Sequence, residues 1–287
     1  MVQMPEIAEV RHVAEQLHQQ LVGKILCIVS VTERLQNKSI IDDKFNPPYI
    51  IDSIKTRGKR ILIHLVDKKK QPTYTLVSWL GMTGRWDFQG DKHTQAVFAC
   101  ATPSATPGAD FSVIDTFMYY NNSRFGMLDI IPHQKLHDWL ISKVGDDLLD
   151  SPPTVEEWIS KWRSWTARKF KQQVCQVLMD QSFYAGVGNY LKAEILYKSR
   201  LYPGLIARDL TDEQLTVLHS NLLQTVQQAY EHGGATLRDY ITPDGKKGRY
   251  QQHLLVYQQK ACPSGHTIQK DTFSDNRTTH WCPECQI

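Results

Sequence analysis

The residues of this chain that are best suited to chemistry stand near its two ends. Near the N-terminus, Met4 is followed by Pro5 and Glu6. Once Met4 is gone, the secondary amine of Pro5 is a nucleophile that can attack C1′ of a sugar and form a Schiff base. Glu6 beside it can protonate the sugar and shuttle protons. The pair therefore predicts catalysis by an amine, provided that Pro5 is the first residue of the mature chain.

The same stretch also predicts the start of a helix. Proline is favoured at the first helical position, and acidic residues are favoured in the first turn. An apolar stripe with the period of a helix follows: Ile7, Val10, Ala14, Leu17 and Leu21. Gly23 would then end the helix in the left-handed conformation. The two interpretations are compatible.

Three residues precede Met4, and they matter to the chemistry. A proline inside a chain is a tertiary amide without a nucleophilic lone pair. Either translation begins at Met4, or the extension is removed, or the protein lacks this nucleophile. We favour Met4 as the working start, because methionine before a small residue is normally removed. A free α-amine titrates near about 8, so that it is partly neutral at physiological pH.

The second group with chemical potential is a set of cysteines and a histidine near the C-terminus. Cys262 and His266 form one closely spaced pair, and Cys282 and Cys285 form the other. Three thiolates and an imidazole from two tight turns satisfy tetrahedral zinc with no open position, so we predict one structural Zn²⁺. The residues between the pairs suit a β-hairpin, in which His280 is an alternative to His266. Metal binding would supply the folding energy of so short a segment.

Composition places the chain among ordinary globular proteins. It has 287 residues, of which 41% are hydrophobic and 22% charged, and this length allows about two domains. The net charge of +3 is too small to identify a nucleic-acid partner. No apolar run reaches the roughly 18 residues of a membrane span, and there is no secretory signal. Cys27, Cys100 and Cys175 are scattered, which favours reduced thiols in an intracellular protein over a disulfide framework.

Two kinds of pattern divide the chain. After the first helix, β-branched and aromatic runs predict strands at residues 60–65, 74–80, 95–100, 111–120 and 127–131, which indicates a β-sandwich or barrel. Beyond residue 133, apolar periodicity predicts helices at 158–165, 167–179, 190–199 and 210–232. The last of these has a capping box, Thr211 with Gln214, and Ser151-Pro152-Pro153 marks a boundary.

Together these residues resemble the formamidopyrimidine-DNA glycosylase/endonuclease VIII family from Pro5 to Cys285. The matching segments, in order, are Met4-Pro5-Glu6 with Glu9-Val10, Arg57-Gly58-Lys59, Leu80-Gly81-Met82-Thr83-Gly84, Arg124-Phe125-Gly126, Gly186-Val187-Gly188-Asn189, Gly233-Gly234 with Thr236-Leu237, Val256-Tyr257 and Arg277. Each segment alone is weak, whereas the whole set in this order is specific. The Cys-His-Cys-Cys finger is similar to that of the endonuclease VIII-like 2 branch of the family.

The resemblance implies an α+β multidomain fold: an N-terminal helix on a β-sandwich, a helical domain with a helix–two-turn–helix motif, and a zinc-finger β-hairpin. We place the sandwich domain at residues 1–132, a linker at 133–153, the helix–two-turn–helix domain at 154–257 and the finger at 258–287. The implied partner is damaged DNA, whether single-stranded, bubble or duplex, with no membrane and no nucleotide cofactor. The family also implies a monomer in the nucleus or cytoplasm, wherever DNA is.

The resemblance implies a reaction as well. Family members are bifunctional DNA glycosylases and AP lyases of base excision repair, in which an N-terminal proline attacks C1′ and β,δ-elimination cuts the strand. Pro5 matches this nucleophile and Glu6 matches the acid. Lys59 matches a lysine that binds phosphate and assists chemistry near the sugar, and strand alternation would place Arg57 and Lys59 on one face. Without the resemblance, this lysine would be one more charge in a basic run.

Three residues match phosphate contacts of the family. Asn189 ends a glycine-rich turn before a helix, where glycines let a DNA backbone approach and helix N-terminal amides suit a phosphate. Arg277 matches a finger arginine that grips the phosphates beside the lesion. Lys246 lies in the loop 244–249, which matches a segment that contacts phosphate or covers the everted base.

A departure from the family pattern concerns the gap left in the stack by an everted base. Met82 and Phe125 match two of the three side chains that fill this gap, but Ser123 stands where the third, an arginine, is expected. Arg124 instead matches a neighbouring phosphate-binding arginine. Because a serine cannot reach the estranged base, the sequence predicts weak reading of that base and tolerance of single-stranded or bubble DNA. We expect oxidised pyrimidines to be favoured.

Two other functions fit parts of the pattern. A DNA-binding protein of the same fold would result if the extension blocked Pro5 permanently. An RNA-binding protein is the second alternative, since helix–two-turn–helix motifs also occur in ribosomal proteins. The second alternative leaves Pro5-Glu6, Lys59 and Met82 without a role.

Overall fold

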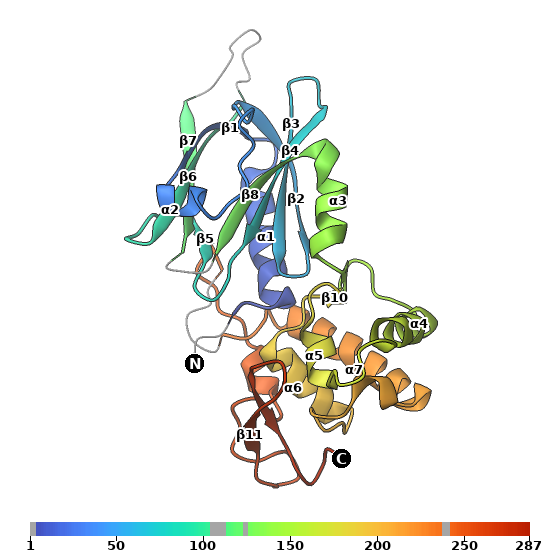
Figure 1. Ribbon diagram of the computed structural model, residues 1–287. Helices are drawn as coiled ribbons and strands as arrows, with labels where there is room; N and C mark the ends of the chain where they lie inside the picture. Colours follow the sequence, from blue (N-terminus) through green and yellow to red (C-terminus); the bar gives the residue numbers. More distant parts are fainter. Residues whose placement is uncertain (1–3, 104–112, 123–125, 237–241) are drawn as a thin grey trace. The chain divides into compact units, whose positions relative to one another are not determined.

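The computed structural model describes residues 4–103, 113–122, 126–236 and 242–287 (Figure 1). It divides into two compact units, which we call the sheet unit and the helical unit. The sheet unit comprises Met1–Pro5, Glu9–Ser142 and Thr236–Gly248, and the helical unit comprises Glu6–Ala8, Lys143–Ala235 and Arg249–Ile287. None of the helices in the described part of the chain is long and apolar enough to cross a membrane.

The described residues of the sheet unit form an eight-stranded antiparallel sheet in the order β5-β7-β6-β1-β2-β3-β4-β8. The strands are β1 (Ile25–Val31), β2 (Tyr49–Arg57), β3 (Arg60–Val66), β4 (Pro72–Trp79), β5 (Arg85–Asp87), β6 (Thr94–Ala101), β7 (Ile114–Asn121) and β8 (Met127–Pro132). In their recorded register β1 and β2 pair at Ile25 with Ile50 and at Leu26 with Tyr49, whereas β1 pairs with β6 along its length. The sheet therefore consists of two four-stranded halves joined at one corner, as in a sandwich.

Helix α1 (Ile7–Leu21) supplies much of the apolar core of the sheet unit. The stripe predicted from the sequence is buried, and in this unit it comprises Val10, Ala14, Leu17 and Leu21. These side chains share one cluster with residues from both halves of the sheet, such as Ile61 and Phe98. Burial of each such side chain stabilises the fold by roughly 1.5–3 kcal/mol. Gly23, with a φ of +87°, follows the helix as predicted.

Helix α3 (His133–Lys143) lies within the segment that the sequence analysis placed in a linker. Leu136 packs with Leu62, Val77 and Ile131 of the sheet, and Figure 1 shows the helix running along β2 to β4. Its packed residues Leu136, Trp139 and Leu140 have helical spacing, which the sequence prediction did not use. Strands β1, β2 and β5 lie in the region predicted to be mostly strands, although no bounds were predicted for them, and the short helix α2 (Glu33–Gln36) was not predicted.

The helical unit is organised around α6, whose central part is buried and includes the charged residues Lys192 and Glu194. The helices are α4 (Val155–Thr166), α5 (Val174–Met179), α6 (Asn189–Lys198) and α7 (Asp212–Glu231), with short 3-10 turns η1 (Ala207–Asp209) and η2 (Tyr250–His253). Every residue from Tyr190 to Leu196 is buried. The capping box of Thr211 with Gln214 is confirmed at the start of α7. The helix predicted at 167–179 begins only at Val174.

Two short sheets complete the helical unit. Strands β9 (Asp146–Asp147) and β10 (Tyr184–Ala185) pair in parallel. Strands β11 (Gln269–Thr272) and β12 (Thr278–Trp281) form the hairpin predicted between the two cysteine pairs. The chain end fixes this hairpin region to the helices, since Gln286 Nε2 donates to the carbonyl of Leu201 at 2.8 Å.

Candidate functional site

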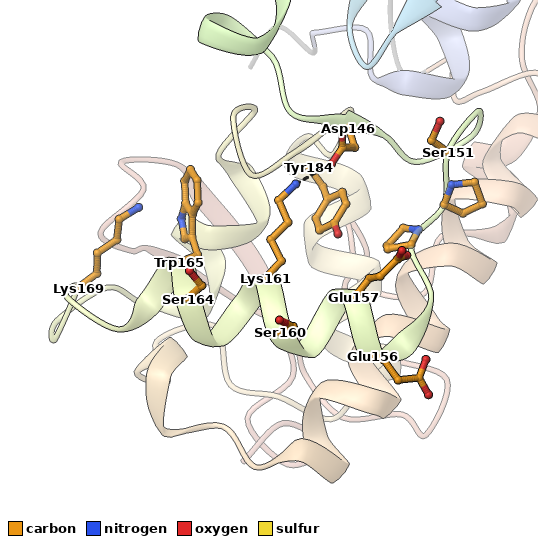
Figure 2. Close-up of a pocket in the computed structure, with 12 residues that line it drawn as sticks. Asp146, Ser151, Glu156, Glu157, Ser160, Lys161, Ser164, Trp165, Lys169 and Tyr184 are labelled. Atoms are coloured by element: carbon orange, nitrogen blue, oxygen red, sulfur yellow. Dashed lines mark hydrogen bonds and ion pairs between the residues drawn. The ribbon is translucent and has the colours of Figure 1, made fainter.

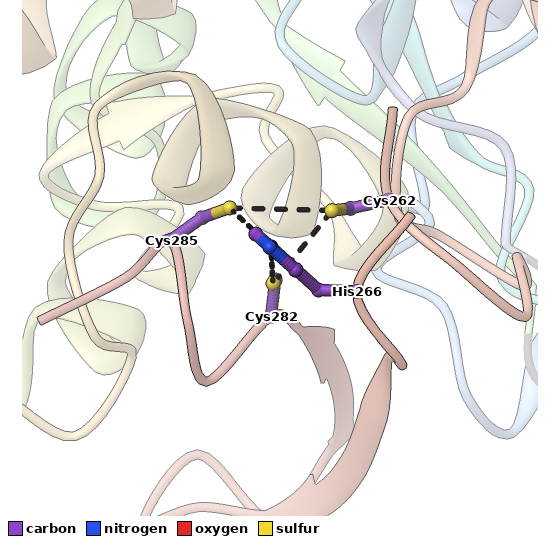
Figure 3. Close-up of side chains that lie close together, drawn as sticks. All are labelled: Cys262, His266, Cys282 and Cys285. Carbon is purple, nitrogen blue, oxygen red and sulfur yellow. Dashed lines mark hydrogen bonds between the residues drawn. The ribbon is translucent and has the colours of Figure 1, made fainter. Parts of the chain in front are cut away.

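The C-terminal cysteines and histidine converge as the sequence predicts (Figure 3). One ligand atom of each of Cys262, His266, Cys282 and Cys285 lies within 4.8 Å of all the others. The Sγ atom of Cys262 is 4.0 Å from that of Cys285 and 3.8 Å from that of Cys282. His266 Nδ1 is 3.3 Å from Cys285 Sγ and 3.8 Å from Cys282 Sγ.

These separations fit a tetrahedral metal ion. Zn–S bonds of about 2.3 Å and Zn–N bonds of about 2.0 Å place ligand atoms about 3.5 to 3.8 Å apart. Burial opposes ionisation of Cys262, but hydrogen bonds from the backbone of His266 and Ser264 lower its pKa to about 6, towards the thiolate that a metal needs. The cluster can therefore hold a metal ion. The alternative ligand His280 lies on β12 against the ring of Tyr257 and is not part of the cluster among the described residues.

The Glu6 carboxylate is buried at the N-terminus of α6. Its oxygens accept hydrogen bonds from the backbone N–H groups of Gly188 at 2.6 Å, Tyr190 at 2.9 Å and Leu191 at 3.3 Å. The side chain is 1% exposed. Because the first N–H groups of a helix have no partner within the helix and carry a partial positive charge, they stabilise an anionic side chain here.

The glycines of the turn before α6 are needed for a different reason from the one that the sequence suggested. We expected its glycines and amides to face a DNA phosphate, but a Cβ at Gly188 would collide with the Glu6 carboxyl group. A Cβ at Gly186, whose φ is +123°, would meet Ile7. The Ile7 N–H also donates to the Gly186 carbonyl at 3.1 Å. The turn thus receives Glu6 and Ile7, and three backbone amides at the start of α6 are occupied by Glu6.

We predict that Gly188→Ala lowers the rate of base release at least about 10-fold, because the added methyl displaces the Glu6 carboxyl group and misplaced catalytic groups lose rates of this order. Single-turnover kinetics on lesion-containing DNA measure this rate. Ser160→Ala, on the exposed surface of α4, serves as the control. A wild-type rate in Gly188→Ala would show that the position of Glu6 does not matter.

The finger loop between β11 and β12 rests on the same end of α6. Asn189 Nδ2 donates to the Thr278 carbonyl at 2.9 Å. Lys192 forms an ion pair with Asp275, and both side chains are buried. On α5, Gln176 Nε2 donates to the Ser274 carbonyl at 2.9 Å. The loop is therefore held by side chains from two helices.

Arg277 is an exposed residue of this loop. Its backbone N–H donates to Asp275 Oδ1 at 3.1 Å, and Asn276 before it has a φ of +55°. The structure records no ion pair between the Arg277 guanidinium and any described residue. The helical unit thus brings three predicted site residues together, namely Glu6, Asn189 and Arg277.

The sheet unit carries other predicted site residues. Pro5 is half-buried. Lys59 is 6% exposed and lies in the two-residue turn between β2 and β3, after Gly58 with a φ of +56°. The expected strand alternation of Arg57 and Lys59 is wrong, because Lys59 belongs to the turn and not to a strand.

Met82 and Lys246 lie in loops of the same unit. Met82 is half-buried and follows the end of β4. Lys246 is exposed and pairs with Asp244 at 2.8 Å, and Gln16 Nε2 of α1 donates to the same carboxylate at 2.7 Å. An exposed pair of this kind contributes little stability, so Lys246 can exchange it for another anion. Ser123, Arg124 and Phe125 lie outside the described residues.

Sequence reasoning missed Lys192 and Asp275. Lys192 and Glu194 both stand within the helix predicted at 190–199, so that a charge there gave no distinct signal, and the partner of Lys192 stands far along the chain. A groove along α4 contains none of the predicted site residues (Figure 2). Lys161 in this groove is held by Asp146 at 2.8 Å and lies 4.0 Å from the ring centre of Tyr184. We assign no function to the groove.

Comparison with known sequences gives two family matches and relatives of the same length. The formamidopyrimidine-DNA glycosylase N-terminal domain matches residues 4–117, and the formamidopyrimidine-DNA glycosylase H2TH domain matches residues 149–240. The chain is 30% identical to a formamidopyrimidine-DNA glycosylase of Bacillus cereus, over 99% of each chain. It is 28% identical to that of Desulforamulus reducens, also over 99% of each chain.

Solved structures show the same similarity. The MutM (Fpg) protein of Thermus thermophilus matches with a TM-score of 0.81 and 26% identity, over 98% of each chain. A Lactococcus lactis Fpg mutant in complex with DNA containing Fapy-dG matches with a TM-score of 0.79 and 25% identity, over 98% of this chain and 99% of that one.

Proposed function

Since this chain belongs to the formamidopyrimidine-DNA glycosylase family, and so is a DNA glycosylase and AP lyase of base excision repair, we propose that it excises oxidised bases through a Schiff base on Pro5. The strand is then cut by β,δ-elimination. Because the chain belongs to this family, we do not retain the alternative of an RNA-binding protein. The substrate is damaged DNA, as in the complex of the Lactococcus lactis relative.

The reaction needs three groups from this chain. With Met4 gone, the Pro5 amine attacks C1′ of the everted nucleotide, and the base leaves with the electrons of the C1′–base bond and takes up the proton lost by the Pro5 nitrogen. The C1′–O4′ bond of the sugar then opens as Glu6 supplies a proton to O4′, which leaves a Schiff base between Pro5 and C1′. The resulting imine makes the neighbouring C–H acidic, so that elimination can expel the phosphates, and water then releases Pro5. Lys59 binds phosphate near the sugar. Met82, Arg124, Phe125, Asn189, Lys246 and Arg277 are the proposed DNA contacts.

One observation supports this assignment above the others. Glu6, directly after the proposed nucleophile, is buried and accepts three hydrogen bonds from the backbone at the start of α6. These hydrogen bonds hold the Glu6 carboxylate in one position. Acid–base catalysis requires such a fixed position of the catalytic group. The finger loop with Arg277 rests on the same turn of α6.

We further propose that the C-terminal cluster binds one structural Zn²⁺ through Cys262, His266, Cys282 and Cys285. Three thiolates and one imidazole leave a tetrahedral ion without an open position, so the ion takes no part in the reaction. When bound, it holds the two turns together and ionises the thiols. The finger then presents Arg277 to DNA.

We predict that oxidised pyrimidines are released at least about 10-fold faster than oxidised purines, and that single-stranded and bubble DNA are cut nearly as well as duplex. The expected tolerance of single-stranded and bubble DNA follows from Ser123, which is too short to fill the gap in a duplex. The preference for pyrimidines follows from the resemblance to the endonuclease VIII-like 2 branch, and a ratio of about 10 corresponds to about 1.4 kcal/mol of discrimination. Base release is measured on matched oligonucleotides that carry an oxidised pyrimidine, 8-oxoguanine or formamidopyrimidine. Ser123→Arg should shift activity towards duplex DNA.

Two results would contradict this preference. Faster release of formamidopyrimidine or 8-oxoguanine than of any oxidised pyrimidine would show that the protein prefers the substrate for which its relatives are named. A strict requirement for duplex DNA, unchanged in Ser123→Arg, would show that other residues fill the gap.

A further inference from the structure

Lys192 and Asp275 form an ion pair whose two side chains are both buried. The side chains are 0% and 4% exposed. Burial of two charges costs several kcal/mol per ion, and apolar residues of similar volume often stabilise a protein as well or better. Packing alone therefore gives no reason to bury a lysine here, in a helix that already buries the carboxylate of Glu194.

Lys192 stands at a junction between two parts of the proposed site. The N–H groups of Tyr190 and Leu191, which bind Glu6, immediately precede it on the first turn of α6. Its partner Asp275 also accepts the backbone N–H of Arg277. One short path of contacts thus runs from the Glu6 carboxylate through the turn of α6 and Lys192 to Asp275 and Arg277.

Charges around Lys192 agree with this geometry. Desolvation lowers the pKa of Lys192, whereas Asp275 raises it most, followed by Cys175 on α5 and Glu6. The ammonium group therefore interacts with both carboxylates. Among the described residues, Tyr250, Tyr257 and His280 are further titratable groups that act on Glu6 or Lys192.

We propose that Lys192 is a positioning residue of the glycosylase reaction. It holds the finger loop, through Asp275, at a fixed position relative to the Glu6 carboxylate on the first turn of α6. This inference rests on the proposed function, because it concerns the acid–base role of Glu6 and the phosphate contact of Arg277. When Arg277 grips a phosphate, the path through Asp275 and Lys192 fixes how far Glu6 lies from the sugar.

The test uses an uncharged replacement of the whole pair. Lys192→Met alone would leave Asp275 buried without its cation, which destabilises proteins by about 3–5 kcal/mol. The double variant K192M/D275N removes both charges, nearly keeps both side-chain volumes and leaves an acceptor for the Arg277 N–H. Lys198→Met is the matched control: this lysine of α6 donates to Thr225 and Gln228 and makes no recorded contact with the finger loop or Glu6. All proteins start at Pro5.

We expect K192M/D275N to melt close to the wild-type temperature and yet to release an oxidised base about 10- to 100-fold more slowly in single turnovers. The limb of the pH–rate profile that reports Glu6 should move to higher pH, because a cation that favours its carboxylate is gone. A purely structural pair would change neither quantity once stability is preserved. Lys198→Met should match the wild type in both.

The outcomes separate this inference from the proposed function. A wild-type rate and pH profile in a folded K192M/D275N protein would overturn the positioning role. If this variant does not fold, K192Q/D275N, which also removes both charges, carries the same test: a wild-type rate and profile there overturns the proposal. Absence of base release by the wild-type protein itself would instead reject the proposed function.

Discussion

Protein that starts at Pro5 is expected to be trapped on abasic-site DNA by borohydride, whereas the full 287-residue form is expected to give no adduct. Only the first form carries a secondary amine at Pro5; in the second, that nitrogen is a tertiary amide and cannot form an imine. The expected difference is close to complete. Denaturing electrophoresis detects the adduct, and peptide mass spectrometry places it on Pro5.

The control is a form that keeps Met4 in front of Pro5 and is otherwise identical. It should behave like the 287-residue protein. An adduct from both forms would mean that another amine, such as that of Lys59, forms the imine. No adduct from either form, with DNA binding intact, would support the alternative of a DNA-binding protein without catalysis. The intact mass of the protein purified from cells then shows which N-terminus occurs.

Loss of the metal is expected to have the second largest effect. Cys282, which is 0% exposed, is one of the four residues of the cluster that can hold the metal. We expect Cys282→Ser to lose one equivalent of bound Zn²⁺ and to bind lesion DNA about 100-fold more weakly or worse. Structural zinc contributes apparent free energies of about 10–16 kcal/mol to small domains, so the finger loop cannot keep its conformation without the ion. Arg277 then loses its place against the phosphate.

Metal content and DNA affinity are measured on the same preparations. Cys27→Ser is the matched control, because Cys27 is half-buried on β1 and lies outside the cluster. It should retain both the metal and the affinity. Full affinity in metal-free Cys282→Ser would show that the helices alone hold the loop. Equal zinc content in both variants would show that the cluster is not the metal site.

The sequence predicted what is local in the chain. The group of three cysteines and one histidine was identifiable because the two residues of each pair sit in one tight turn. Their spacing in the sequence therefore already places their side chains close together. The capping box of Thr211 and the left-handed Gly23 are equally local. The fold class is confirmed, because a stripe on α1 and a series of strands bounded by turns leave few architectures open. The domain limits and the roles of the site residues remain proposals.

What the sequence did not predict depends on partners far apart in the chain. Gly188 was assigned to a DNA phosphate because glycine signals a close approach but not its cause, which is Glu6. Lys192 carries no signal of its role for the same reason, since its meaning depends on Asp275. Lys59 was placed on a strand because a two-residue turn shifts the alternation of side chains. A residue type such as glycine indicates that another group lies close by, but only the fold shows which group that is.

The binding of Glu6 by the start of α6 has a consequence for synthesis of the protein. The residues that receive this carboxylate are made more than 180 positions later, since Gly188 is 182 residues further along the chain. Ribosomes add about 5–20 residues per second, so an emerging chain waits on the order of 10 to 40 seconds before its acid can be seated. During that interval the nascent polypeptide has its amine but no ordered proton donor. The enzyme is therefore expected to have no DNA-cleaving activity until its second half has folded.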